Sequence, residues 1–359
     1  MSKKFIAMLM AFVIVLSLVC TGCANDTPSA SSDETITFVD GGGTEVTIPK
    51  NVTKIACWSS TIESVVIGLG ACDKLASSEY FDESHKWMYE MFPEMNDISK
   101  TASGEWNAET MLSMGVEVVL VKNAKNAETM RNAGLTAVHL DFTTIEATIE
   151  SIKLIGLITG KEEQANKCAE LLAYYDELVS ERLAGVDDAT KPIIYYNICR
   201  NNTPDSVLNN TYSYGCFDTV WIEKAGGKVV SEGWEIGEGL VEINLEELYS
   251  ADPDYIFVSG VYQEFTYSDL VGGNYDELLT AVKNGNVIRV PQGIYDWGQA
   301  GVETCLVTIW AAKTLYPDLF ADIDMHEIAA DFYKDVVGVE LNDDQIAAIL
   351  NGQNGSEGK

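Results

Sequence analysis

The sequence predicts an α/β protein with two Rossmann-like lobes, joined by a single long helix, and a ligand cleft between the lobes. Short apolar segments alternate with helical segments over residues 35–142 and again over 186–352. That rhythm is typical of mainly parallel sheets covered on both faces. Between the two regions lies a stretch without strand patterns, residues 143–185. The chain has 359 residues, and a domain usually has ~100–200, so two lobes fit this length better than one.

The amino terminus has the pattern of a secretory signal. Lys3 and Lys4 precede the apolar run Phe5–Val19, and the small residues 20–23 (Cys-Thr-Gly-Cys) follow it. The run is short for a membrane-spanning helix, which needs ~20 apolar residues. We therefore expect a signal peptide over 1–22. Residues 20–23 resemble a bacterial lipobox with Cys23 as the lipidated residue. The alternative is an ordinary cleavage site and a structural Cys23.

The first lobe is expected over residues 35–142, after a polar, flexible tether at 23–34. Two alternating segments around Gly41–Gly43 predict a β-hairpin. No Gly-Lys-Ser/Thr follows these glycines, so they do not form a phosphate-binding loop. Strands and helices then alternate; the expected strands are Lys54–Trp58, Val116–Val121 and Thr136–Asp141, and the expected helices are Thr61–Leu69 and one beginning near Asn107.

The long helix and the second lobe follow. Glu162–Leu183 carries an apolar stripe at helical spacing and predicts one helix of roughly 33 Å within the linker 143–185. In the second lobe, 186–352, strands are expected at 192–198, 255–259 and 287–291, and helices at 303–315, 325–337 and 343–350. Residues 353–359 are expected to be a disordered tail.

Charge and cysteine content exclude several classes of function. The chain has 23 Lys+Arg against 55 Asp+Glu, a formal net charge of −32. Such acidity argues against nucleic acid, whose phosphates need clustered basic residues, and against attraction to an anionic membrane surface. Beyond residue 23 six cysteines are scattered without a zinc-site spacing. Disulfides are permitted outside the cytoplasm, but we expect mostly small buried side chains.

Several segments together carry a resemblance to a known family. They are Asp40–Pro49, Glu63 with Gly68–Lys74, Glu223–Gly227, Asp252–Val258, Ala281–Val287 and Trp310–Phe320. In this order and spacing, from about Thr35 to Leu350, the chain resembles the substrate-binding lipoproteins of ABC importers for ferric siderophores, haem and cobalamin (class III periplasmic-binding proteins). The resemblance implies two α/β lobes, one long helix and a ligand held between the lobes.

Candidate ligand-binding residues follow from the loops at the carboxyl ends of strands, where ligands of open α/β sheets bind. Aromatic side chains there would bury much of a large, flat chelate, and a guanidinium would pair with an anionic group on it. These candidates are Trp58, Tyr80, Trp106, Arg200, Tyr214, Trp234, Tyr262 and Trp297. Trp221 and Trp310 lie in helical patterns and are expected in the core.

The resemblance also implies docking to a permease through one acidic residue on each lobe. Glu63 matches the first, and Asp218 or Glu223 would supply the second. The alternative for Glu63 is an exposed carboxylate favoured by the positive end of a helix dipole. Opposed charges across such a contact would mainly steer orientation and association rate.

Other functions find less support in the residues. A glycosidase could use a carboxylate pair from the segment 232–242, but the chain is acidic throughout, and no Gly-x-Ser-x-Gly motif is present. The three histidines, His85, His139 and His326, are too few for a site that captures a free metal ion. Haem would need an axial ligand such as Tyr80 or Tyr262, or the Tyr214 already named. A lipid-anchored adhesin or signalling protein stays open.

The sequence therefore predicts a non-enzymatic, lipid-anchored, extracytoplasmic binding protein of an ABC importer. Its expected cargo is a metal chelate: a ferric siderophore first, then cobalamin or another corrinoid, then haem. It is expected to be a monomer without a resident cofactor or metal ion. Its expected partners are the permease with its ATPase, and the membrane through the lipid anchor, but not nucleic acid.

Overall fold

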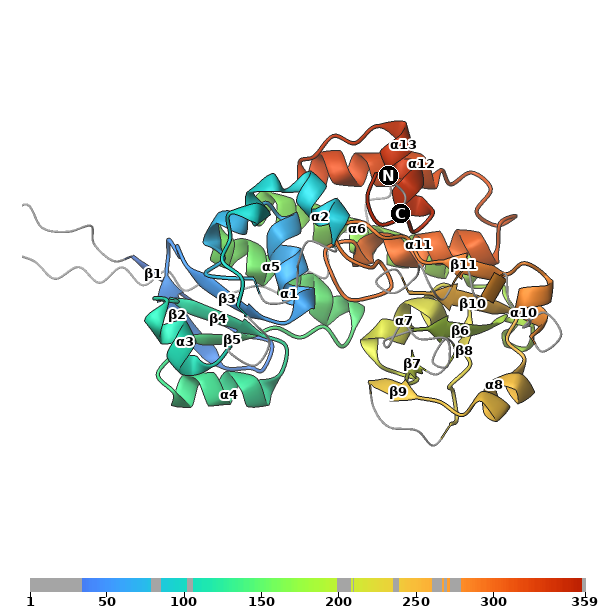
Figure 1. Ribbon diagram of the computed structural model, residues 1–359, viewed down its shortest axis with the longest axis horizontal. Coiled ribbons are helices and arrows are strands. Elements are labelled where there is room, and N and C mark those ends of the chain that lie inside the picture. Colours follow the sequence, from blue (N-terminus) through green and yellow to red (C-terminus); the bar gives the residue numbers. More distant parts are fainter. Residues whose placement is uncertain are drawn as a thin grey trace, which may run out of the picture.

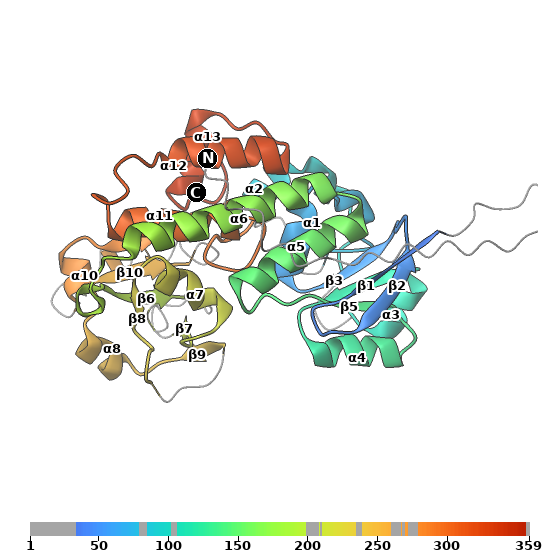
Figure 2. The same cartoon turned by 180° about the vertical axis from the view of Figure 1, so that it is seen from behind.

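The computed structural model describes residues 34–78, 85–101, 106–198, 208, 210–234, 239–259, 267, 270–271 and 279–356. The expected signal peptide and almost all of the expected tether lie outside these residues, as does Cys23. The described chain forms two lobes side by side, with one long helix running along the back of both (Figures 1 and 2). Among the described residues we find no helix with the length and apolar character needed to cross a membrane.

The first lobe contains a hairpin and a parallel sheet, as the sequence predicts. The antiparallel hairpin pairs β1 (Thr35–Val39) with β2 (Glu45–Pro49). The parallel sheet has the order β3-β4-β5, built from Ile55–Trp58, Val118–Val121 and Ala137–His139. Every residue of β4 is buried, because the central strand of a covered parallel sheet has no exposed face.

One buried carboxylate attaches the hairpin to this sheet. Asp40 accepts the backbone N–H groups of Gly42, Thr44 and His139 at 2.9–3.0 Å, and the Arg131 guanidinium lies 2.5 Å from it. Burial alone would raise the pKa of Asp40, but these donors together lower it below its usual value. The ionised carboxylate therefore accepts hydrogen bonds from the hairpin turn and from the edge of the sheet, and so joins the two.

Short helices surround the first sheet. Asn107 and Asn123 cap α3 and α4 with their side-chain oxygens. The helices and 3₁₀ turns are α1 (Ser60–Gly68), η1 (Cys72–Lys74), α2 (Lys86–Met91), η2 (Pro93–Asn96), α3 (Ala108–Ser113) and α4 (Ala124–Asn132).

Two helices, α5 and α6, fill the linker where the sequence predicted one named helix. α6 (Glu162–Leu183) has the predicted bounds, and α5 (Ile145–Thr159) precedes it. Gly160, in the left-handed region at φ 71°, ends α5 and reverses the chain. α6 packs on α5 of the first lobe and on α11 (Thr304–Leu315) of the second. It is thus the helix that bridges the lobes.

The second lobe is built on a four-stranded parallel sheet. Its order is β11-β10-β6-β8, with the strands Val287–Arg289, Tyr255–Val258, Ile193–Asn197 and Lys228–Val229. A small antiparallel pair lies beside it: β7 (Asn210–Tyr212) and β9 (Leu240–Glu242). The sequence missed β7, β8 and β9, each of only two or three residues.

Helices surround this sheet and form the carboxyl-terminal part of the chain. They are η3 (Asp188–Thr190), α7 (Phe217–Lys224), α8 (Leu245–Ala251), α10 (Thr280–Lys283), α11, α12 (Met325–Phe332), the π-helical turn η6 (Tyr333–Val337) and α13 (Asp343–Leu350). Trp221 and Trp310 are 2% and 7% exposed, so the prediction that they belong to the core is confirmed.

The end of the chain corrects one expectation. Residues 353–356 belong to the segment expected to be a disordered tail, but they pack on α2 of the first lobe. The Trp87 indole N–H donates to the Gln353 carbonyl at 2.5 Å, and Asn354 and Ser356 form further hydrogen bonds with Lys86 and Glu90. The backbone finds partners there because α2 leaves donors and a carboxylate exposed on that side. Residues 357–359 lie outside the described chain.

Candidate ligand-binding site between the lobes

The segment 291–303, which follows β11, fills the junction between the lobes. It is buried along almost its whole length. On one side it packs against α1: a methyl group added at Gly68 would lie 2.6 Å from Val302, and one at Gly301 would lie 2.9 Å from the Ser64 hydroxyl. This close approach requires glycine at both positions and fixes the segment against the first lobe.

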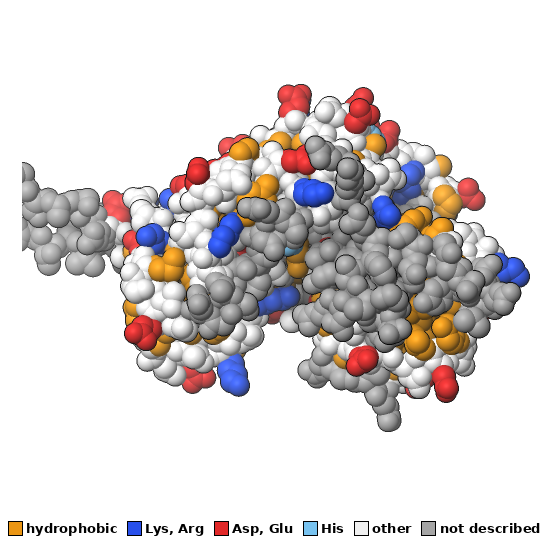
Figure 3. Space-filling view, in the orientation of Figure 1, with side chains coloured by type: hydrophobic (Ala, Val, Ile, Leu, Met, Phe, Trp, Pro, Cys, Tyr) orange, Lys and Arg blue, Asp and Glu red, His pale blue; other side chains and the backbone are white. Residues whose placement is uncertain are grey.

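A hydrogen bond between the lobes lies beside Gln299, the partly exposed residue of this segment. The Tyr295 hydroxyl lies 3.2 Å from the hydroxyl of Ser60, which begins α1, and 3.0 Å from the Gln299 side-chain oxygen. Tyr295 is 8% exposed. In Figure 3 the molecular surface is notched between the two lobes. Tyr295 thus links the two walls of the junction through one polar contact.

A buried carboxyl group holds the Tyr295 backbone in place. Glu303 accepts the N–H groups of Ile294 and Tyr295 at 2.6 and 3.0 Å and the Tyr333 hydroxyl at 2.7 Å. Complete burial raises the pKa of Glu303 to about 7, although these hydrogen bonds act in the opposite direction. The position of Tyr295 therefore depends on a group that titrates near neutral pH.

On the first lobe, the carboxyl ends of β3 and β4 supply polar groups to the junction. Lys122 follows β4, and its ammonium donates to the Thr61 hydroxyl at 3.4 Å. Burial raises the pKa of Asp218 on α7, and the charge of Lys122 partly opposes this shift. Lys122 and Asp218 therefore interact electrostatically across the junction.

On the second lobe, the carboxyl end of β10 and the 291–303 segment meet. The Ser259 hydroxyl donates a short hydrogen bond to Asp296, whose other oxygen accepts the N–H of Gly298 at 2.9 Å. Two stacked tyrosines, Tyr196 and Tyr212, lie beside this group with ring centroids 6.1 Å apart. Burial, helped by neighbouring carboxylates, raises the pKa of both hydroxyls, so they stay protonated.

Three predicted tryptophans have different positions. Trp58, at the carboxyl end of β3, is half-buried. Trp106 is only 4% exposed, and its indole N–H donates to the Cys57 carbonyl at 3.3 Å. Trp297 is fully buried against Tyr333. The expected exposure of Trp106 and Trp297 in the cleft is thus wrong, because both rings turn inward and fill the cores beside their strands.

The remaining predicted ligand-binding residues lie on the second lobe or outside the described chain. Trp234 is half-buried and packs on the core behind β6 and β10. Tyr214 is 45% exposed, beside Glu223, which raises the pKa of the Tyr214 hydroxyl. Tyr80, Arg200 and Tyr262 lie outside the described residues.

The three docking candidates also differ in exposure. Glu63 is fully buried, because α1 lies between the first sheet and the 291–303 segment. In this conformation its carboxylate presents no surface to a partner. Asp218 and Glu223 on α7 are partly exposed. Burial raises the pKa of Glu223, while the Tyr214 hydroxyl lowers it.

Sequence reasoning missed the polar residues that meet at the junction. Ser60, Lys122, Ser259 and Asp296 each follow a strand, and that position was the available signal. In the described chain the cysteines at 57, 72, 168, 216 and 305 are free thiols, and no group of three or more His, Cys, Asp or Glu side chains is placed to hold a metal ion.

No protein-family model matches the chain. The molybdate-binding protein MolA of Haemophilus influenzae is 23% identical over 333 residues, covering 85% of this chain and 91% of MolA. The structure of MolA bound to molybdate superposes with a TM-score of 0.72 at 19% identity, covering 85% of this chain and 99% of MolA.

Two further solved structures show the same arrangement. An ABC transporter solute-binding protein of Sulfurospirillum deleyianum has a TM-score of 0.73 at 20% identity, covering 87% of this chain and 98% of that one. CeuE of Helicobacter pylori, in a nickel–histidine complex, has a TM-score of 0.69 at 20% identity, covering 88% and 99%. The chain therefore has the two-lobed fold of TroA-like periplasmic binding proteins, which confirms the fold expected from the sequence.

Proposed function

We propose that this chain is the extracytoplasmic solute-binding component of an ABC importer and binds a metal chelate between its lobes. One observation carries the proposal: the carboxyl ends of both parallel sheets face one junction. Ser60 and Lys122 come from β3 and β4, and Ser259 and Tyr295 follow β10 and β11. Ligands of open α/β sheets bind at such strand ends.

The charges at the junction favour a chelate over a bare oxyanion. Asp218 and Asp296 flank the position, and among the described residues Lys122 is a cation that acts on Asp218. An anion such as molybdate would be repelled by the carboxylates unless they were protonated. A neutral or cationic chelate with aromatic or hydroxamate groups would instead contact tyrosine rings and hydroxyls. We propose a ferric siderophore as the cargo, followed in order of preference by corrinoids and haem.

A second cargo class is an oxyanion, favoured by the likeness to MolA. Lys122 and the amino-terminal end of α1 would be its donors. This alternative requires the junction carboxylates to be neutral, so oxyanion binding should strengthen at low pH. Chelate binding has no such requirement.

Anchoring and docking complete the proposal. Lipidation at Cys23 would hold the chain at the outer face of the membrane. Docking would use Glu223 or Asp218, both partly exposed on α7. The resulting complex would release its ligand into the permease, without chemistry by this chain.

The test is a tryptophan-fluorescence titration of the chain from residue 23, with Cys23→Ser. The titrants are ferric hydroxamate and catecholate siderophores, cobalamin, haem, nickel–histidine and molybdate. We expect saturable quenching by one chelate class. Tyr295→Phe should weaken binding by about tenfold, a loss on the order of 1.4 kcal/mol, because the interlobe hydrogen bond is removed.

The matched control is Tyr249→Phe, since Tyr249 is a partly buried tyrosine of the second lobe that packs on a different core cluster from Tyr295. It should leave the affinity unchanged. Saturable binding of molybdate alone would replace the chelate by the oxyanion, and no binding of any titrant would contradict the transport role.

A further inference from the structure

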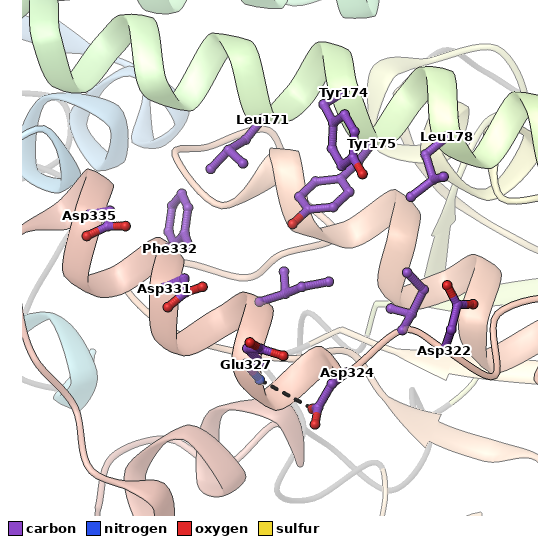
Figure 4. Close-up of a pocket in the computed structure, with 12 residues that line it drawn as sticks. Leu171, Tyr174, Tyr175, Leu178, Asp322, Asp324, Glu327, Asp331, Phe332 and Asp335 are labelled. Atoms are coloured by element: carbon purple, nitrogen blue, oxygen red, sulfur yellow. Dashed lines mark hydrogen bonds between the residues drawn. The ribbon is translucent and has the colours of Figure 1, made fainter. Parts of the chain in front are cut away.

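A second groove lies apart from the junction, between the long helix α6 and the pair α12–η6 (Figure 4). Its volume is about 400 Å³, within the range of small-molecule sites. None of its lining residues belongs to the junction described above. The groove thus requires its own explanation.

One wall of the groove is apolar and aromatic. α6 contributes Leu171, Tyr174, Tyr175 and Leu178, which lie along one side of the helix (Figure 4). Phe332 closes the opposite side from α12. Tyr174 is 57% exposed, so its ring presents a free aromatic face. Such a wall suits the methylene groups of a ligand and, through the ring, a cation.

The other wall carries carboxylates. Two of them are already engaged: Asp322 makes a two-pronged ion pair with Arg182 at 2.6 and 2.8 Å, and Asp324 caps α12. Glu327, Asp331 and Asp335 are exposed, and among the described residues no side chain pairs with their carboxylates. The groove therefore has three free negative charges.

The basic residue at the other end does not neutralise them. The Lys167 ammonium pairs with Glu163 at 3.0 Å and donates only to the backbone carbonyl of Asp335, at 3.4 Å. Arg182 and Lys167 thus close the two ends of the groove while the carboxylates between them stay unpaired.

The hydroxyl of a mostly buried tyrosine reaches the same groove. Tyr175 is only 8% exposed, and its hydroxyl has no hydrogen-bond partner among the described residues. Figure 4 shows its ring reaching from α6 toward α12. Burial raises the pKa of Tyr175 to about 12, so the group stays a neutral donor and acceptor. A polar ligand in the groove would supply a hydrogen-bond partner to this hydroxyl.

We propose that this groove binds a linear polyamine. Glu327, Asp331 and Asp335 follow one another at four-residue spacing along α12 and η6, and all three line the groove. On α12, this spacing places the Glu327 and Asp331 side chains about 5–6 Å apart. Three or four methylenes separate the ammonium groups of a linear polyamine by a similar distance. The ammonium groups would pair with the carboxylates, while the methylenes lie on the apolar wall.

The row also argues against a single divalent metal ion. Ca²⁺ and Mg²⁺ need oxygen ligands that converge on one point at 2.0–2.6 Å. Carboxylates spaced along a helix do not converge in this way. A flexible chain of separated charges matches the geometry better than a point charge.

Isothermal titration calorimetry with spermidine tests the proposal, at about 50 mM NaCl so that screening is moderate. We expect one saturable site. The double variant Glu327→Gln/Asp331→Asn should weaken spermidine about tenfold or more, and Tyr175→Phe should weaken it several-fold through loss of the hydroxyl. Putrescine, with two charges, should bind more weakly than spermidine.

The matched control is Glu177→Gln/Glu181→Gln, which removes two charges at the same spacing from exposed positions of α6 outside the groove. It should leave spermidine binding unchanged. Equal weakening by both double variants would mean diffuse attraction to an acidic protein and would overturn the site. Absence of saturable binding, Mg²⁺ binding as tight as spermidine, or tighter binding of a basic peptide would also overturn it. Thermal unfolding confirms that each variant is folded.

Discussion

At the scale of single residues, Glu303 links the packing of the second lobe to its binding surface. Its two oxygens together accept two backbone N–H groups and the Tyr333 hydroxyl. Tyr295, one of the residues whose N–H it accepts, makes the hydrogen bond between the lobes. A charge change at Glu303 therefore acts on the junction without touching the ligand.

The raised pKa of Glu303 has a direct consequence for stability. The folded state keeps the proton up to about pH 7, whereas the unfolded chain loses it near 4.5. This group's contribution to the free energy of unfolding is fully present below pH 4.5 and is lost as pH rises through 7. The loss amounts to about 3 kcal/mol.

Urea denaturation at pH 5 and pH 7.5 measures this loss. Glu303→Gln should show a smaller decrease in unfolding free energy between the two pH values than the wild type. It will be less stable at low pH, because the amide places a donor against a donor. Glu340→Gln, at an exposed position, is the control and should keep the wild-type decrease. Equal decreases in all three proteins would contradict the titration of Glu303.

Single residues also show what local sequence can reveal of the site. The sequence predicted aromatic ligand-binding side chains near strand ends, but Trp106 and Trp297 are core residues. A large ring beside a strand can pack inward or outward, and the local sequence does not distinguish the two. The only signal at Ser60 and Lys122 was their position after a strand, because a serine or a lysine gains its role only when the other lobe is in place.

At the scale of elements, α5 and α6 pack closely because a glycine, Gly156, lies at their contact. A methyl group at Gly156 on α5 would overlap the Ala165 methyl on α6 and lie 3.1 Å from the Lys161 carbonyl. The tight turn between the helices leaves no room to separate them. Close approach here fixes the start of the bridging helix.

Gly156→Ala is therefore expected to lower the free energy of unfolding by about 1–3 kcal/mol through overpacking. Gly185→Ala, just beyond α6, meets nothing within 4 Å and is the control. It should be neutral or slightly stabilising. Chemical denaturation of both variants measures the difference; an unchanged Gly156→Ala protein would show that α5 can shift without cost.

Long elements were the predictable part of the fold. The apolar stripe of α6 set its bounds, and β3, β4, β6 and β10 are runs of four or five residues that are apolar apart from Asn197 at the end of β6. The short strands β7–β9 were missed, since a strand of two or three residues is stabilised by its neighbours and not by its own pattern. α5 was also missed as a separate helix, because its helical pattern continues into that of α6 with only Gly160 and Lys161 between them.

At the scale of the whole molecule, the excess of 32 negative charges is distributed over both lobes. Like charges repel, and compaction brings them closer than they are in the unfolded chain. Salt screens this repulsion within a Debye length of about 10 Å at 0.1 M. The folded state should therefore gain from added salt.

We expect the melting temperature at pH 7.5 to rise by about 3 °C between 10 and 300 mM NaCl. The same experiment near pH 4.2, the isoelectric point, should show little change, because the net charge is then close to zero. Differential scanning calorimetry at both pH values measures the effect. A melting temperature that falls with salt at pH 7.5 would mean that attractive ion pairs outweigh the repulsion.

The hydrogen bonds between residues 353–356 and α2 have a consequence for biosynthesis. The hydrogen-bond acceptor of the Trp87 indole, the Gln353 carbonyl, is synthesised 266 residues later. While the chain is still being synthesised, the first lobe has no such partner for α2, and that side of the helix stays uncovered. The first lobe is synthesised first but gains its last hydrogen bonds only when the chain ends. A stop codon shortly before residue 353 would therefore remove these bonds from α2 in the first lobe, although the deleted residues follow the second lobe in the sequence.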